Sequence, residues 1–192
     1  MLIFLILAPY GAFSLLMLVT SAAASLFAAA AIGLAVIAYD VLGVRSIKIL
    51  GAGSAILFTS LGAYLTLVDS SWSVSAVKLT VDAGMFAISL GSLAIRFPFT
   101  LQYAREMVDA QTADLPGFLT ANYIITGAWS VAFLLMLMAN LLMIYVPGLP
   151  LWSGLAIAFA ARNSAVYFTK WYPAYRRAKY GTLPAAGVLS GS

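Results

Sequence analysis

The stretch ANYIITGAWSVAFLLMLMANLLMIYV, residues 121–146, decides the fold class of this chain. It carries no charged side chain, and it is longer than the roughly 20 helical residues that cross the hydrocarbon core of a bilayer. Its apolar residues are continuous and do not alternate with polar ones, which indicates a helix rather than a strand. Because a helix satisfies its own backbone hydrogen bonds in lipid, we expect a transmembrane helix here.

Further apolar segments on both sides of this stretch are long enough, or nearly so, to span a bilayer. The predicted spans are 2–20, 22–39, 48–68, 78–96, 121–146 and 150–170. We therefore predict an all-α protein, a polytopic membrane helical bundle of about six transmembrane helices. It forms a single transmembrane domain, residues 1–192, that includes a tail at 171–192.

The composition of the whole chain supports this prediction. Of its 192 residues, 64% are hydrophobic and only 8% are charged, whereas a soluble domain carries about a quarter charged residues. The chain also has no cysteine and no histidine. Thiolate nucleophiles, disulfides, Cys/His zinc sites, iron–sulfur clusters, His-ligated haem and imidazole bases are therefore excluded. We predict no enzyme activity and no cofactor.

The basic residues gather in alternate connections, and this pattern predicts the orientation. The connection between the second and third spans, the one between the fourth and fifth spans, and the tail hold most of the lysines and arginines. They are Arg45, Lys48, Arg96, Arg105, Lys170, Arg176, Arg177 and Lys179. The positive-inside rule then places both termini in the cytoplasm. We interpret the net charge of +4 as this excess in the loops, and not as a sign of nucleic-acid binding.

The start of the chain allows a second interpretation. Residues 2–20, followed by Ser21-Ala22-Ala23-Ala24, imitate a signal peptide with a small-residue cleavage site. No lysine or arginine precedes the apolar run, however, and Pro9 interrupts it. We favour a retained first span; removal of residues 1–24 would leave five spans with the tail still in the cytoplasm.

The connection between the fourth and fifth spans, residues 96–120, contains an amphipathic segment. Its apolar face is formed by Leu101, Ala104, Met107 and Val108, and its polar face by Gln102, Arg105, Glu106 and Asp109. We predict a short interfacial amphipathic helix on the cytoplasmic surface. It is broken by Asp114-Leu115-Pro116-Gly117 before the fifth span begins. Arg96, Arg105 and Trp171 are the predicted interfacial residues.

Arg162 is the most unusual single residue, because it falls near the middle of the sixth predicted span. A charge there costs roughly 2.5–3.5 kcal/mol on insertion scales. It lies on one face with the small residues Gly154 and Ala158, so it either points into the bundle and needs a partner, or belongs to a late-starting helix and snorkels to the cytoplasm.

Asp82 is the corresponding acid, one turn inside the outer end of the fourth span. One interpretation is a local pair with Lys78 at i,i+4, and the other is that Asp82 faces a polar cavity. Asn122, Asn140 and Asn163 are candidate hydrogen-bonding fasteners between helices. Small residues at four-residue spacing predict closely packed faces: Ser25, Ala29 and Gly33; Ala83, Ala87 and Gly91; Gly154 and Ala158.

Several short motifs resemble those of the bacterial intracellular septation protein A family. They are Ala8-Pro9, Trp72, Val77-Lys78-Leu79-Thr80-Val81, Pro98-Phe99, Asn122 with Trp129 and Phe133, and Asn140. The likeness covers about residues 60–170, and the chain departs from the pattern where Phe97 separates Arg96 from Pro98. The resemblance implies a multi-spanning inner-membrane protein linked to envelope synthesis and division, without a catalytic residue.

Two functions follow from these observations. The first is an interaction or scaffold protein of the bacterial inner (plasma) membrane, which binds other membrane proteins or a second copy of itself within the lipid bilayer and binds no nucleic acid. The second is a small-solute or ion transporter or channel that uses Arg162 and Asp82. Exposure of both residues to one water-filled cavity would favour transport, whereas pairing in a dry core would favour the first function.

Overall fold

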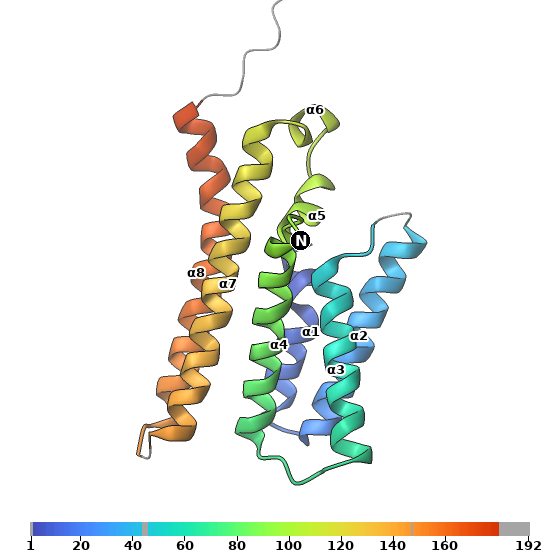
Figure 1. Cartoon of the computed structure of the whole chain (residues 1–192), viewed down its shortest axis with the longest axis vertical. Helices are drawn as coiled ribbons and strands as arrows, with labels where there is room; N and C mark the ends of the chain where they lie inside the picture. The colour runs from blue at the N-terminus through green and yellow to red at the C-terminus, as the bar shows by residue number, and fades with distance from the viewer. Residues whose placement is uncertain (1, 44–45, 147, 181–192) are drawn as a thin grey trace, which may run out of the picture.

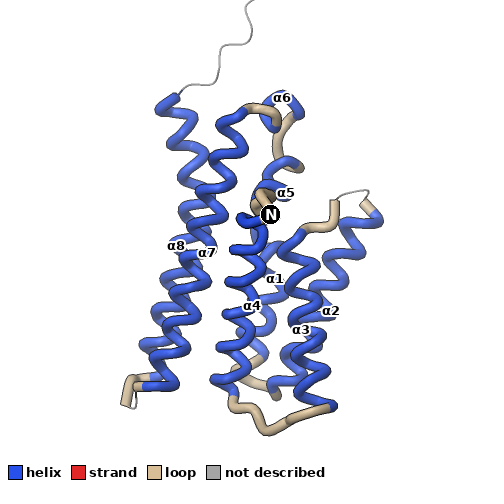
Figure 2. The backbone as a smooth tube through the Cα atoms, viewed as in Figure 1, coloured by secondary structure: helices blue, strands red, loops and turns tan. Residues whose placement is uncertain are grey.

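The computed structural model describes residues 2–43, 46–146 and 148–180, and the secondary structure within these ranges is entirely helical. The helices are α1 (Leu2–Leu16), α2 (Ala22–Leu42), α3 (Ile49–Leu67), α4 (Val74–Ala94), α5 (Phe99–Arg105), α6 (Ala110–Ala113), α7 (Pro116–Tyr145) and α8 (Leu151–Tyr180). Figure 2 shows that short connections join most of them. The prediction of an all-α chain is confirmed.

The long helices run up and down, and they form two groups that meet along α4 and α7 (Figure 1). In the first group α2 packs between α1 and α3, and α3 packs against α4. In the second group α7 and α8 form a hairpin. The short helix α5 packs against α7 and α4 at the upper end in Figure 1, where α6 also lies.

Four of these helices, α2, α3, α4 and α7 from Gly117, are long and apolar enough to cross a membrane. The structure thus supports a membrane protein, as the composition predicted. Of the two other predicted spans, α1 has only 15 residues, and α8 carries Arg162 and Lys170 along its length. Crossing by α1 and α8 stays a prediction.

Three helices extend beyond the predicted spans for identifiable reasons. α4 begins at Val74 instead of residue 78, because the hydroxyl of Ser73 caps the helix by accepting from the Ala76 amide at 3.2 Å. α7 begins at Pro116 instead of residue 121, since proline is compatible with the first helical turn. α8 continues past residue 170 to Tyr180, so the first part of the predicted tail is helical; residues 181–192 lie outside the described ranges.

The predicted amphipathic segment is helical only in part, and its pattern of burial was predicted wrongly at two positions. α5 ends at Arg105, and a separate turn of helix, α6, follows. Gln102, assigned to the polar face, is buried, whereas Met107, assigned to the apolar face, is 67% exposed. The reason is that α5 is buried along Phe99–Tyr103, so both of its faces meet protein.

The small-residue faces were predicted correctly for α2 but not for α4. Ser25, Ala29 and Gly33 are buried, and a side chain at Gly33 would meet the Ala55 Cβ atom at 3.3 Å. At Gly91, by contrast, a Cβ atom would have no neighbour within 4 Å. The buried stripe of α4 instead contains Asp82, Met85, Ser89 and Ser92, because α4 turns its polar side chains towards α7.

Candidate functional site

Asp82 lies at the centre of a polar cluster formed by α1, α4 and α7. Asp82 is 3% exposed, and its two carboxylate oxygens accept hydrogen bonds from different helices. The Tyr10 hydroxyl of α1 donates to Oδ1 at 2.7 Å, and the Asn140 amide of α7 donates to Oδ2 at 2.5 Å. Sequence reasoning singled out Asp82 and Asn140, and the structure brings them together; it did not find Tyr10.

The cluster lies at one depth in the bundle. Asp82 is eight residues from the start of α4, Tyr10 six from the end of α1, and Asn140 five from the end of α7. At about 1.5 Å per helical residue, these three side chains start about 8–12 Å from the helix ends at the bottom of Figure 1. Three helices that are distant in sequence therefore present polar groups at matching heights.

Two cations lie on the helices that carry or border this cluster. Lys78 lies one turn before Asp82 on α4. Arg162 lies on α8 and is half-buried. Among the described residues the ion pairs within 4.0 Å involve neither cation. In place of the local Lys78–Asp82 ion pair, the neutral donors Tyr10 and Asn140 bind the carboxylate.

Arg162 lies well inside α8 and is half-buried, and its inward orientation stays a prediction. α8 begins at Leu151, so the helix does not start late, and Arg162 falls about 16 Å from that end. Asn163, its neighbour, is exposed, and its amide donates to the Phe159 carbonyl of the same helix at 2.7 Å. Asn163 therefore stands apart from the cluster.

A seam of hydroxyl groups continues along α7 above Asp82, where α7 packs first against α4 and then against α5. The Ser89 and Ser130 hydroxyls lie 2.7 Å apart, and those of Thr100 and Thr126 are also 2.7 Å apart. All four residues are buried. Sequence reasoning missed this seam, although Asn122, Thr126 and Ser130 recur every four residues in the fifth predicted span, which was the available signal.

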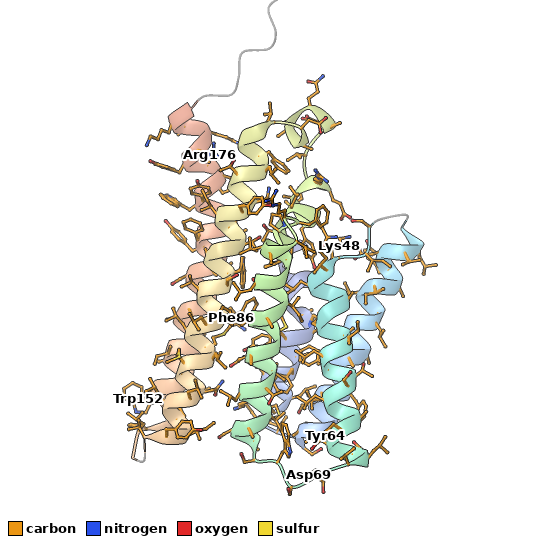
Figure 3. The ribbon with its side chains drawn as sticks, viewed as in Figure 1. Lys48, Tyr64, Asp69, Phe86, Trp152 and Arg176 are labelled. Atoms are coloured by element: carbon orange, nitrogen blue, oxygen red, sulfur yellow. The ribbon has the colours of Figure 1, made fainter. Side chains whose placement is uncertain are left out.

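A second charged cluster lies at the opposite end of the bundle, where Figure 3 labels Lys48. The side chain of Lys48 is 2% exposed and pairs with Asp40 at 2.9 Å and Glu106 at 2.7 Å. Gln102 adds two bonds to the backbone on either side of Lys48: it accepts from the Ile49 amide at 2.6 Å and donates to the Ile47 carbonyl at 3.1 Å. These contacts tie α5 to the connection between α2 and α3.

The cluster also changes the chemistry of Tyr103 on α5. This residue is buried, and the Lys48 ammonium lies 5.9 Å from the centre of its ring. Burial, followed by the negative charges of Asp40 and Glu106, raises the pKa of the Tyr103 phenol well above its usual range. Sequence reasoning used Lys48 only as an orientation signal and did not predict this cluster, because its members are far apart in the chain.

The predicted interfacial residues lie towards the same end as Lys48. Arg96 and Arg105 are exposed, and Arg96 ends α4 in a left-handed conformation with φ 58°. Trp171 stacks on Tyr175 with ring centroids 5.0 Å apart. One turn further on, Arg176 donates to the Gly117 carbonyl at 2.8 Å and joins the ends of α8 and α7 (Figure 3).

The outer surfaces of the bundle are apolar, and shallow grooves run between its helices. One groove lies between α7 and α8, and its lining includes Ala128, Ala132, Leu135, Ala161, Ala165 and Phe168. Another lies between α2 and α3 and is lined mainly by aliphatic residues. Asp82 and Arg162 line neither groove.

Comparison of the chain with models of protein families, with curated proteins and with solved structures finds no match. The residues themselves therefore carry the functional argument.

Proposed function

We propose that the chain is an integral protein of the bacterial inner membrane with six spans and with both termini in the cytoplasm. Two features support this topology. The α2–α3 connection, the α5–α6 segment and the end of α8 lie at one end of the bundle, and the other connections lie at the opposite end (Figure 1). The first end carries most of the basic residues of the chain, as the positive-inside rule requires of a cytoplasmic face.

Within this membrane we propose an interaction or scaffold role, with envelope growth or septation as the process served. The observation that supports it best is the closure of the polar core. Asp82 is buried and bonded to Tyr10 and Asn140, and among the described residues no buried side-chain nitrogen or oxygen lacks a hydrogen-bond partner. The polar groups thus bind each other, while the apolar outer faces are left for lipid and for other membrane proteins.

The resemblance to the septation protein A family supports the same role. Two of the residues that carry it, Asn140 and Trp129, lie in the interior contacts: Asn140 donates to Asp82, and the Trp129 indole donates to the Thr169 hydroxyl at 3.0 Å. The shared positions are then ones that maintain the fold. Partners would be recognised by other surfaces, including the basic and aromatic end of α8.

Transport is the second candidate, and one observation favours it. Asp82 is buried within α4, and a second ionisable residue, Arg162, lies half-buried within α8. Intramembrane ionisable groups mark ion pathways in many membrane proteins. Transport would require the Asp82 cluster to open to water during a cycle.

The experiment that separates these functions is a deletion strain complemented at matched membrane levels by wild type or by Arg162→Ala. A scaffold role predicts filamentation, bulging or sensitivity to envelope stress that both forms rescue. A normal envelope with a solute-specific growth defect, rescued by wild type and not by Arg162→Ala, would exclude the scaffold role and support transport. If Arg162→Ala accumulates normally in the membrane but rescues no defect, the role of Arg162 is not purely structural.

A further inference from the structure

We propose that Asp82 is a proton-binding site within the membrane domain, with the Tyr10 hydroxyl as the group that changes its hydrogen bond when the proton binds. This inference goes beyond the interaction role and does not depend on it. It rests on the arrangement of neutral donors and an alternative acceptor around one buried carboxylate.

The hydrogen-bond donors to the Asp82 carboxylate are both neutral. Oδ1 accepts from Tyr10 at 2.7 Å and Oδ2 from Asn140 at 2.5 Å, and no cation of the described residues lies within ion-pair distance of it. An ionised carboxylate in a medium of low polarity is costly unless it is paired, and such groups commonly become neutral instead. Uptake of one proton is the simplest way in which this site becomes neutral.

The surroundings accommodate the protonated form with the same number of hydrogen bonds at Asp82. The Met136 sulfur lies 3.6 Å from the Tyr10 oxygen and can accept its hydrogen. When a hydronium ion transfers a proton to Asp82 Oδ1 and becomes water, the new O–H donates to the Tyr10 oxygen, and the Tyr10 hydrogen rotates from Oδ1 to Met136. Asn140 continues to donate to Oδ2. The carboxylate gains one proton, its hydrogen bond with Tyr10 reverses direction, and both protonation states remain satisfied.

The charged and titratable residues of the neighbouring helices form no ion pair with Asp82 among the described residues. Lys78 comes from α4 itself, and Arg162 from α8. α7 contributes the neutral Asn140 and Met136, and the titratable residue of α3, Tyr64, packs against Trp72 instead. Within hydrogen-bond distance the carboxylate therefore meets neutral groups alone among the described residues.

Proton binding at this site would change how strongly α1, α4 and α7 are held together. The ionised carboxylate accepts two charge-assisted hydrogen bonds, which are about twice as strong as neutral ones. The protonated form retains only neutral bonds. The contact between the α1–α4 group and the α7–α8 hairpin is therefore tighter when the proton is absent.

The test is a pH titration of the intact protein in lipid bilayers with ¹³C-labelled aspartate, in which the carboxyl carbons are followed by solid-state NMR. Wild type is expected to show one aspartate signal that changes from the ionised to the protonated form between about pH 5 and 9, and Asp82→Asn should lack that signal. Asp40→Asn is the matched control, because Asp40 is also buried but is paired with Lys48; it should leave the signal unchanged.

Tyr10→Phe identifies the signal without removing the carboxylate, so the test does not depend on the folding of Asp82→Asn. It removes one charge-assisted donor, and the midpoint of the titration should move up by about one to two pH units. Met136→Leu removes the alternative acceptor of the protonated form and should move the midpoint down. A wild-type signal that stays in one form across the range, or that does not respond to Tyr10→Phe, would overturn the proposal.

Discussion

Replacement of Lys48 by methionine tests whether the charged cluster holds α5 against the rest of the bundle. The substitution keeps most of the side-chain volume and removes the ammonium, which is 2% exposed and pairs with both Asp40 and Glu106. Asp40, with a side chain only 7% exposed, would be left as a buried charge without its cation. Such a change costs about 3–5 kcal/mol of unfolding free energy.

The structure also sets the expected values for two related variants. Glu106 is 20% exposed at its side chain, so it can turn to water, and Glu106→Gln should cost only about 1 kcal/mol. The double variant Asp40→Asn/Lys48→Met removes both buried charges, and it should recover most of the loss seen for Lys48→Met alone.

The assay is equilibrium unfolding in mixed detergent micelles, followed by tryptophan fluorescence. The single variant Lys48→Met is expected to be the least stable of the three variants. A loss below about 1 kcal/mol for Lys48→Met would refute it, and so would a double variant no more stable than the single one, because then the buried Asp40 charge is not the source of the cost.

Three further predictions follow from other contacts. Ser89→Ala and Ser130→Ala, combined in a double-mutant cycle of unfolding free energies, should give a coupling of about 0.6 kcal/mol, and at most about 1.7; additive losses would contradict the 2.7 Å contact between the hydroxyls. Gly33→Leu should destabilise the protein by about 1–3 kcal/mol, because Ala55 is 3.3 Å from the new Cβ position, whereas Gly91→Leu, with open space, should be near neutral; equal losses in thermal melts would argue against the α2–α3 packing. The pKa of Tyr103 is raised in the folded protein, so the unfolded chain releases this proton near pH 10 while the folded chain retains it. Stability is therefore lost as pH rises above about 10. Tyr103→Phe should reduce that alkaline loss in pH-dependent melts.

The sequence predicted the helices well because each long apolar segment reports its own environment. Residues 22–39 and 48–68 correspond closely to α2 and α3, where hydrophobicity alone locates the helix. Ends set by local chemistry were missed, as at Ser73, whose cap depends on one hydroxyl, and at Pro116, which starts a helix as readily as it breaks one.

The candidate site could be predicted only as separate residues. Asp82, Asn140 and Arg162 are conspicuous because polar groups are rare in an apolar span, and the structure brings the first two together beside Tyr10. Tyr10 itself gave no signal, since a tyrosine in a hydrophobic helix is ordinary. The Lys48 cluster was missed for another reason. Asp40 lies at the end of α2, Lys48 just before α3 and Glu106 just after α5, and neither charge nor spacing in the sequence encodes their meeting in the fold.

The proposed six-span topology is tested most directly by labelling single cysteines in intact cells with a membrane-impermeant maleimide. The natural chain has no cysteine, so each introduced thiol reports one position. Ser71→Cys and Leu149→Cys should react from outside, and Gln111→Cys and Ala178→Cys only after the cells are opened. Reaction of Ala178→Cys from outside would show that α8 does not return across the membrane, and reaction of Gln111→Cys from outside would reverse the proposed orientation; either result would contradict the six-span protein with cytoplasmic termini.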